Sequence, residues 1–277
     1  MSTQLSGEWL QRLQRLSQAE PGHPRLPLVW QGHTLGSVDP RLLAHIALAA
    51  PSQLPTMLQK EERDGHIQWR LQGHIGATLE QLAALLRQLD LGHVRAQWRD
   101  ELLTVCDADT LQPLGRVERG IVRLLGLTTH AVHLVGFDHR GYHWVQQRSL
   151  SKATDPGLWD TLMGGMINAG DSLDGALERE AWEEAGLRLE DLQDLQHGGQ
   201  VWLRKPHTLD GGLGYVVERV DWFCTTLREG CVPHNQDGEV AQFACWSPSE
   251  LNLHLQQEAL TTEAAIVLVA ALARPLH

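Results

Sequence analysis

The chain has 277 residues, of which 42% are hydrophobic, and its formal net charge is −11 at pH 7. This length and hydrophobic content suit one large domain or two smaller ones with a sizeable core. The acidic excess falls almost entirely after residue 120, and no run of basic residues forms a nucleic-acid-binding face, so nucleic acid is not expected as a partner.

The cysteines and the longest apolar run indicate the compartment. Cys106, Cys224, Cys231 and Cys245 have no CxxC spacing and no signal peptide precedes them, so we expect reduced thiols in a cytoplasmic protein. The longest apolar run, Ala264–Ala273, is too short to span a bilayer. We therefore expect no membrane partner and interpret this run as a terminal helix that packs on the core.

Residues 1–118 are predicted to form a small α+β accessory domain without a catalytic motif. Asp39 and Pro40 are a typical N-cap and first residue of a helix, and Gly92 lies just beyond another. In chain order the pattern predicts a helix within 1–20, a hairpin of 26–30 and 33–38, a helix at 40–50, a strand at 68–71, a helix at 78–89, and a hairpin of 102–106 and 114–117.

Residues 119–277 are predicted to form a second domain, in which strands alternate with two helices. Alternating apolar and polar residues place strands at 130–137, 142–147, 199–203, 215–225 and 240–246. One helix follows a glycine-rich loop in the middle of this domain, and the other is the terminal helix.

The stretch from Gly164 to Leu187 is predicted to form that glycine loop and a short helix. Asp171 is a good N-cap, and Gly186 stands where a glycine commonly ends a helix. Four apolar residues recur at three- and four-residue steps and predict one buried face: Leu173, Ala176, Leu177 and Ala181.

Glu180, Glu183 and Glu184 lie at i, i+3 and i+4 on another face of this helix. Carboxylates at this spacing repel each other, so their gathering is favourable where a cation neutralises them. Mg²⁺ and Mn²⁺ are hard cations that prefer oxygen ligands of this kind. The alternative is a solvated acidic face, which is common on helices.

The residues around these glutamates resemble the Nudix box. The pattern of that box is Gly, five residues, Glu, seven residues, Arg-Glu-apolar-any-Glu-Glu-any-Gly-apolar. This sequence has Gly165, five residues, Asp171, seven residues, and then residues 179–187, which read Arg-Glu-Ala-Trp-Glu-Glu-Ala-Gly-Leu. We call residues 165–187 the box, Gly164 and Gly165 the box glycines, and Glu180, Glu183 and Glu184 the box glutamates. Asp171 in place of Glu is the single departure, and it shortens by one methylene the side chain that would support Arg179.

The resemblance implies the Nudix fold, an α/β/α sandwich with a mixed sheet, and a metal-dependent hydrolase of a small-molecule diphosphate. The cofactor is then Mg²⁺ or Mn²⁺. We expect Glu180 and Glu184 as the chief metal ligands, with Glu183 at the same cluster and the Gly164 carbonyl as a further ligand. The metal would neutralise the diphosphate and lower the pKa of the attacking water.

Two other roles follow from the same resemblance. Arg179 is expected to orient Glu180; the alternative is a surface ion pair that contributes little. The base towards the attacking water is expected to be Glu180 or Glu239, because Nudix enzymes often use an acidic residue just ahead of a late strand. Glu218 is the second candidate for that acidic residue, and a solvated hairpin acid is the alternative for Glu239.

Three residues are expected near the substrate phosphates. Glycines before a helix let the backbone approach a phosphate, which favours Gly165. Arg148 and Lys152 follow the strand at 142–147 and are the cations that we place there, although loop cations are usually only solvated.

The first domain resembles the N-terminal domain of a thiamine-related Nudix subfamily, which includes the N-terminal half of some fungal thiamine pyrophosphokinases. The similar segments are residues 31–40, Gln-Gly-His-Thr-Leu-Gly-Ser-Val-Asp-Pro, and then residues 119–126 and 129–136. This resemblance implies hydrolysis of a thiamine-type diphosphate, oxidised forms included, to the monophosphate and phosphate.

Two other functions stay open at the level of sequence. One is a pyrophosphatase for a nucleoside diphosphate derivative such as ADP-ribose or NADH. The other is a non-catalytic ligand-sensing protein with the same fold, which the retention of all three box glutamates disfavours. The sequence leaves open which bond is cut and whether the chain forms a homodimer.

Overall fold

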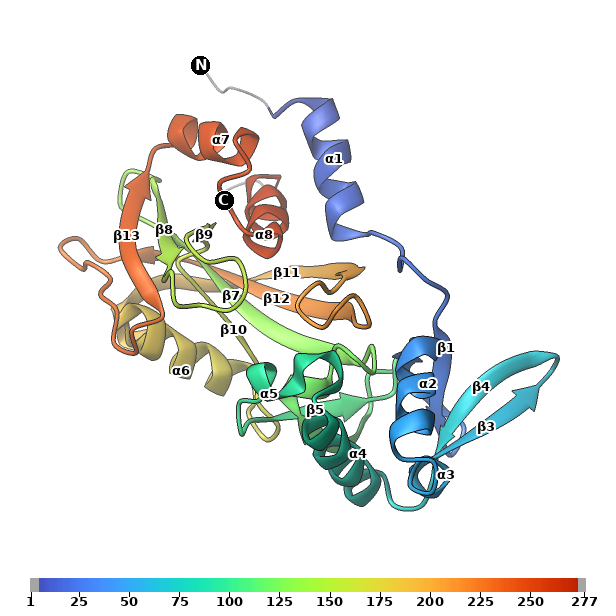
Figure 1. Ribbon diagram of the computed structural model, residues 1–277. Coiled ribbons are helices and arrows are strands. Elements are labelled where there is room, and N and C mark those ends of the chain that lie inside the picture. The colour runs from blue at the N-terminus through green and yellow to red at the C-terminus, as the bar shows by residue number, and fades with distance from the viewer. Residues whose placement is uncertain (1–4, 274–277) are drawn as a thin grey trace.

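The computed structural model describes residues 5–273, which contain two main sheets and a separate two-stranded hairpin. In Figure 1 the larger sheet lies between layers of helices, and the smaller sheet lies beside it with α2, α3 and α4. The hairpin of β5 and β6 lies between these two parts, close to the start of α6.

The larger sheet has seven strands in the order β11-β12-β7-β8-β13, with β9 paired to β8 and β10 paired to β7. β12 is parallel to β7 and the other pairs are antiparallel, so the sheet is mixed. Its strands are β7 (Thr128–Phe137), β8 (His143–Arg148), β9 (Trp159–Asp160), β10 (Met163–Met166), β11 (Leu192–Pro206), β12 (Tyr215–Leu227) and β13 (Val240–Trp246).

Helices cover both faces of this sheet. Alternate side chains of β7 point to opposite faces, so Val132 and Leu134 pack with α6 while Ala131 and Val135 pack with α8. These two apolar layers confirm the predicted α/β/α sandwich. The covering helices are α6 (Leu173–Ala185) on one face and α1 (Gly7–Ser17), α7 (Pro248–Gln256) and α8 (Thr262–Leu272) on the other, with a short 3₁₀ turn, η3 (Leu189–Asp191), after α6.

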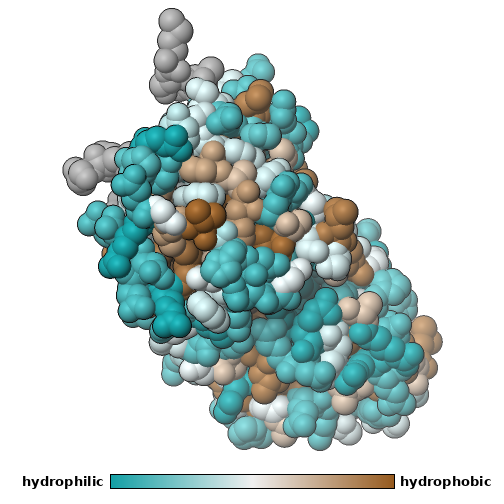
Figure 2. All heavy atoms as spheres, turned by 90° about the vertical axis from the view of Figure 1, so that its left-hand side faces the viewer, coloured by the Kyte–Doolittle hydropathy of each residue, from teal (hydrophilic) through white to brown (hydrophobic). Residues whose placement is uncertain are grey.

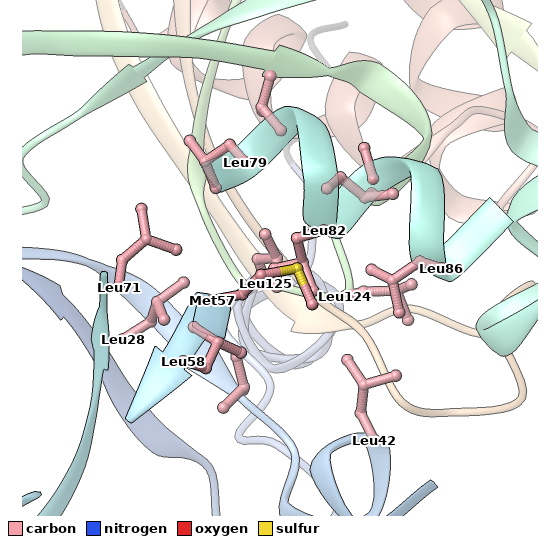
Figure 3. Packing of buried hydrophobic residues seen from close by; sticks show 14 of the residues in the cluster. Leu28, Leu42, Met57, Leu58, Leu71, Leu79, Leu82, Leu86, Leu124 and Leu125 are labelled. Atoms are coloured by element: carbon pink, nitrogen blue, oxygen red, sulfur yellow. The ribbon is translucent and has the colours of Figure 1, made fainter. Parts of the chain in front are cut away.

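The first half of the chain has a core of its own (Figure 3), in which leucines of the small sheet interlock with those of α2 and α4. Leu124 and Leu125, which follow the predicted boundary at 118/119, also pack into this core, and that boundary stays a prediction. The elements are β1 (Leu26–Trp30), β2 (His33–Val38), α2 (Pro40–Ala49), α3 (Leu54–Met57), β3 (Leu58–Arg63), β4 (His66–Leu71), α4 (Ile75–Leu89), η1 (Leu91–His93), α5 (Val94–Gln97), β5 (Leu102–Cys106), β6 (Pro113–Glu118) and η2 (Arg119–Ile121).

Most of the predicted elements are present, but one predicted cap is wrong. The N-cap of α6 is Ser172, whose Oγ accepts a hydrogen bond of 3.0 Å from Gly175 N–H. Asp171 pairs with Arg179. Asp39 does cap α2, and Gly186 does end α6 in the left-handed region with φ of 62°. The pattern also missed β3, β9, β10, α3, α5 and α7, and it made β11 too short. Gly164 and Gly165 lie in β10 instead of in the predicted glycine loop, because this segment pairs with β7.

The face that Figure 2 presents, where β13 and α6 lie, is largely hydrophilic, with hydrophobic side chains gathered in its upper half. Within residues 5–273, every helix is too short or too polar to cross a bilayer.

Candidate functional site

The box begins within β10 and continues through the loop at 167–172 into α6. β10 carries Gly164 and Gly165, and its pairing with β7 holds both glycines at the middle of the sheet. A Cβ atom on Gly165 would lie 2.1 Å from Cδ of Glu180, so this carboxylate lies directly against the glycine backbone. A Cβ on Gly164 would lie 2.6 Å from the ring of buried His133. An alanine at 165 would therefore displace the flexible end of Glu180, whereas an alanine at 164 would meet a buried ring.

Glu184 is the most buried of the three box glutamates, with 3% of its surface exposed. Its Oε2 accepts hydrogen bonds from Gly164 N–H at 2.9 Å and from the Gln146 side chain at 2.8 Å. Burial raises the pKa of Glu184 to about 8, and the two donors only partly oppose this effect. A carboxylate in this position favours a nearby cation.

Arg179 forms ion pairs with three acids of the box, Asp171, Glu180 and Glu183. Its Nη1 contacts Glu180 at 2.8 Å and Glu183 at 3.1 Å, and its Nη2 contacts Asp171 at 3.1 Å and the Met166 carbonyl at 3.4 Å. Burial raises the pKa of Glu180 although Arg179 acts in the opposite direction. The side chain of Glu180 is 12% exposed and that of Glu183 is 44% exposed, so Glu183 lies at the rim.

Glu239 lies directly before β13 and contacts the loop that follows β8. Lys152 forms an ion pair with Glu239, and the Ser149 N–H donates to the Glu239 carbonyl at 2.8 Å. Burial would raise the pKa of Glu239, but the hydrogen bond and charge of Lys152 lower it. The charge of Lys152 also acts on Glu184, so this loop lies near the box.

Arg148 is the other predicted phosphate-binding cation, and its side chain is only 14% exposed. It contacts Asp160 at 3.4 Å and the Thr154 carbonyl at 3.1 Å. Arg148 therefore holds the loop in place in this structure, with its charge close to Glu239.

Glu218 is the second candidate for the acidic residue ahead of a late strand, and its hydrogen bonds are with residues outside the box. It is 4% exposed and accepts hydrogen bonds from Arg123 at 2.9 Å and Thr129 at 2.8 Å. These partners lower its pKa in spite of burial. The geometry describes a buried structural ion pair and favours Glu239 as that acidic residue.

The search for motifs missed two residues of this region. Gln146 contacts Glu184, and only the alternation of β8 could have signalled that it faces the box. Arg119 pairs with Glu101 at 2.7 Å, and its charge acts on both Glu180 and Glu239. Arg119 begins the segment 119–126 that carries the subfamily resemblance, but the sequence predicts no role for it at the site, because it reaches the site through the fold.

Arg119 is brought there by the hairpin of β5 and β6. Ala169 N–H, in the glycine loop, donates to the Leu102 carbonyl at 2.7 Å, and Leu103 forms a bridge with Asn168. The first half of the chain is thus fixed to the box by backbone contacts.

The donors in this region fit a hard divalent cation. Among residues 5–273, no three acidic, histidine or cysteine side chains already converge as a metal cage. Glu184 is nonetheless buried and Glu180 partly buried, and both have raised pKa values, so a cation would stabilise them in the charged form. Gln146 adds a buried amide oxygen without a partner among the described residues. These are the oxygen donors that Mg²⁺ and Mn²⁺ prefer.

Comparison with known proteins shows what the chain resembles. It is 34% identical over 151 residues to Nudix hydrolase 20, chloroplastic, of Arabidopsis thaliana, a match that covers 52% of this chain and 38% of that one. It is 33% identical over 150 residues to Nudix hydrolase 24, chloroplastic, of the same plant, covering 52% and 40%. The chain thus spans about two fifths of the length of these two relatives.

A crystal structure of DR0079 from Deinococcus radiodurans superposes with a TM-score of 0.49 and 17% identity, covering 63% of this chain and 100% of that one. The family model of the NUDIX domain matches residues 127–266, just over half of the chain. Because that match begins at β7 and ends within α8, it includes the whole larger sheet and the box, and the chain therefore belongs to the Nudix family.

Proposed function

We propose that the chain is a metal-dependent diphosphatase that hydrolyses a thiamine-type diphosphate, oxidised forms included, to the monophosphate and phosphate. The hydrolase part of the proposal rests on two contacts, each between a box glutamate and one of the box glycines. Glu180 lies against Gly165, and Glu184 accepts the Gly164 N–H. This arrangement holds two carboxylates against the same short strand, β10, as ligands of one cation site must be held.

Each residue has a role in this proposal. Glu180, Glu184 and the Gly164 carbonyl would hold Mg²⁺ or Mn²⁺, with Glu183 at the rim. The chemistry that the ion supplies when bound is neutralisation of the diphosphate oxygens and a lower pKa for the attacking water. Arg179 holds Glu180 in place. Glu180 or Glu239 accepts the proton of the water as its oxygen attacks phosphorus and the bridging oxygen leaves.

Cations would offset the charge of the substrate. Arg148 ends β8 and Lys152 lies on the loop that follows, both beside Glu239, but each is engaged with an acid of the protein. Arg119 has Glu101 as its one acceptor for the guanidinium group within the described residues, which leaves donors for a phosphate. We therefore include Arg119 with Lys152 and Arg148 as phosphate-binding residues.

The thiamine part of the proposal rests on the first domain. Two of the three segments that carry the resemblance, residues 31–40 and 119–126, pack against each other. Ser37 N–H donates to the Leu125 carbonyl at 2.9 Å, and a Cβ on Gly36 would lie 2.5 Å from the Gly126 carbonyl oxygen. This close packing supports the view that the segments belong to one structural unit.

The cytoplasmic location is also proposed. Cys106, Cys224, Cys231 and Cys245 all lie within the described residues and form no disulfide, which is compatible with a reducing compartment.

The test is phosphate release in the presence of Mg²⁺ or Mn²⁺. Thiamine diphosphate and its oxo and oxy analogues are compared with ADP-ribose and NADH, and an added phosphatase reveals AMP from the last two. We expect turnover of the thiamine set. Turnover of ADP-ribose or NADH alone would retain the hydrolase and refute the thiamine substrate. Binding without turnover of any of these compounds would favour the ligand-sensing alternative.

A further inference from the structure

Gln146 lies in the interior between the sheet and α6. It is on β8 and is 1% exposed. Its Nε2 donates to Glu184 at 2.8 Å, on the same carboxylate oxygen that accepts the Gly164 N–H. The other end of the side chain, Oε1, is buried and has no hydrogen-bond partner within residues 5–273.

A buried amide oxygen without a partner is unfavourable. Two other described side chains have a buried polar atom of this kind, His143 at Nδ1 and Asn168 at Oδ1. Of the three, Gln146 alone has a hydrogen bond to a box carboxylate. When Glu184 is ionised, as a metal ligand must be, only the NH₂ end of the amide can donate to it.

Gln147, the next residue of β8, has a hydrogen-bond partner at both ends of its amide. Gln147 donates from Nε2 to the Gly157 carbonyl at 2.9 Å, and its Oε1 accepts from Gln242 at 2.6 Å. Both ends of Gln147 are used for structure. Gln146 uses one end and keeps the other beside the box.

We propose that Gln146 belongs to the divalent-cation site: its Nε2 positions Glu184, and its Oε1 takes part in binding the cation, directly or through a water that the cation retains. This inference rests on the proposed metal-dependent function and adds a ligand group outside the box. Amide oxygens are suitable donors to hard cations, which often keep several waters. A partner that orients a metal-binding carboxylate typically contributes 10–100-fold in metal affinity.

The experiment compares the full chain with Gln146→Leu and, as a matched control, Gln147→Leu. Mn²⁺ binding is measured by calorimetry and by the electron paramagnetic resonance of free Mn²⁺, without substrate. We expect Gln146→Leu to weaken Mn²⁺ binding about tenfold or more and Gln147→Leu to leave it unchanged. Gln146→Asn keeps the amide but shortens its reach, and it serves as the second variant if the leucine variant does not fold.

Urea unfolding in EDTA separates this role from a structural one. Leucine removes the unpaired oxygen, which favours folding, but also the donor to Glu184, which opposes it. We therefore expect Gln146→Leu to unfold in EDTA close to the wild type and to gain less stability from Mn²⁺. Lower stability in EDTA with unchanged Mn²⁺ affinity would overturn the inference. If the wild-type chain itself binds no Mn²⁺, both this inference and the proposed metal-dependent function are wrong. If wild type and Gln146→Leu bind Mn²⁺ with equal affinity, only the role of Gln146 is wrong.

Discussion

Replacing Gly165 with alanine tests the contact on which the site is built. The added Cβ would lie 2.1 Å from Cδ of Glu180 and 2.3 and 2.4 Å from its two oxygens. Ordinary contact begins near 3.4 Å, so the carboxylate must retreat by about 1.3 Å. The obstacle is the end of a flexible side chain, and Gly165 has no left-handed φ that would strain an alanine.

The expected result is therefore a loss of activity with little loss of stability. A displacement of about 1 Å in a positioned catalytic group lowers the rate by about 10²-fold, or about 2.7 kcal/mol. The free energy of unfolding of Gly165→Ala should remain within about 1 kcal/mol of the wild-type value. The ion pair between Glu180 and Arg179 is weakened, but alanine lowers the conformational entropy of the unfolded chain, and the two effects nearly cancel.

The assay measures kcat/KM with the substrate found by the phosphate-release screen, together with unfolding in urea. Gly76→Ala is the control, since its nearest neighbour atom would be 3.5 Å away and alanine suits the helix. Gly164→Ala should instead destabilise the fold by about 1–3 kcal/mol, because the ring of His133 is buried and cannot retreat. Wild-type kcat/KM in Gly165→Ala would refute the reasoning that Glu180 must lie where this structure has it.

The remaining predictions concern four other positions. Glu184→Gln should lower metal-dependent kcat/KM by at least about 10²-fold while the chain stays folded, and near wild-type turnover would exclude Glu184 from the mechanism. Arg119→Ala should raise KM about tenfold with a smaller change in kcat, since one phosphate contact is lost; an unchanged KM speaks against this contact. Arg123→Ala should destabilise the fold by about 3–5 kcal/mol in urea unfolding, because it leaves Glu218 buried without its cation; a loss below about 1 kcal/mol contradicts this. Burial lowers the pKa of His143 to about 4, so the unfolded chain takes up that proton first as pH falls from 6.5 towards 4, and stability should fall there by up to about 1.4 kcal/mol per pH unit. The His143→Phe variant should lose that part of the pH dependence in urea titrations, and an identical slope would show that His143 does not carry it.

Local signals in the sequence were sufficient for much of the fold. Asp39-Pro40 starts a helix and Gly186 ends one, because caps depend on neighbouring residues alone. The wrong cap at Asp171 shows the limit of this reasoning. Asp171 and Ser172 are both suitable caps, and a residue eight positions later decides between them, since Arg179 engages Asp171.

The residues that sequence reasoning missed are those that come from other elements. Gln146 lies on β8, outside the box, and contacts Glu184 only because the fold brings β8 next to α6. Arg119 follows the hairpin of β5 and β6, which contacts the loop before α6. Their roles depend on which elements become neighbours, and strand order is a property of the whole fold. A motif within one helix carries no such information.

The three box glutamates show how the fold distinguishes residues that look equivalent in sequence. Leu177 and Ala181 form the buried stripe of α6, and Glu184 comes three residues after Ala181, so it continues the same stripe. Glu183 is one step around the helix and lies at the rim. A carboxylate on an apolar stripe is unfavourable unless the interior supplies donors or a cation. The interior here supplies Gly164 N–H and Gln146, and it leaves the carboxylate with a pKa of about 8. The position that is least favourable for folding is therefore the one where a bound cation adds most.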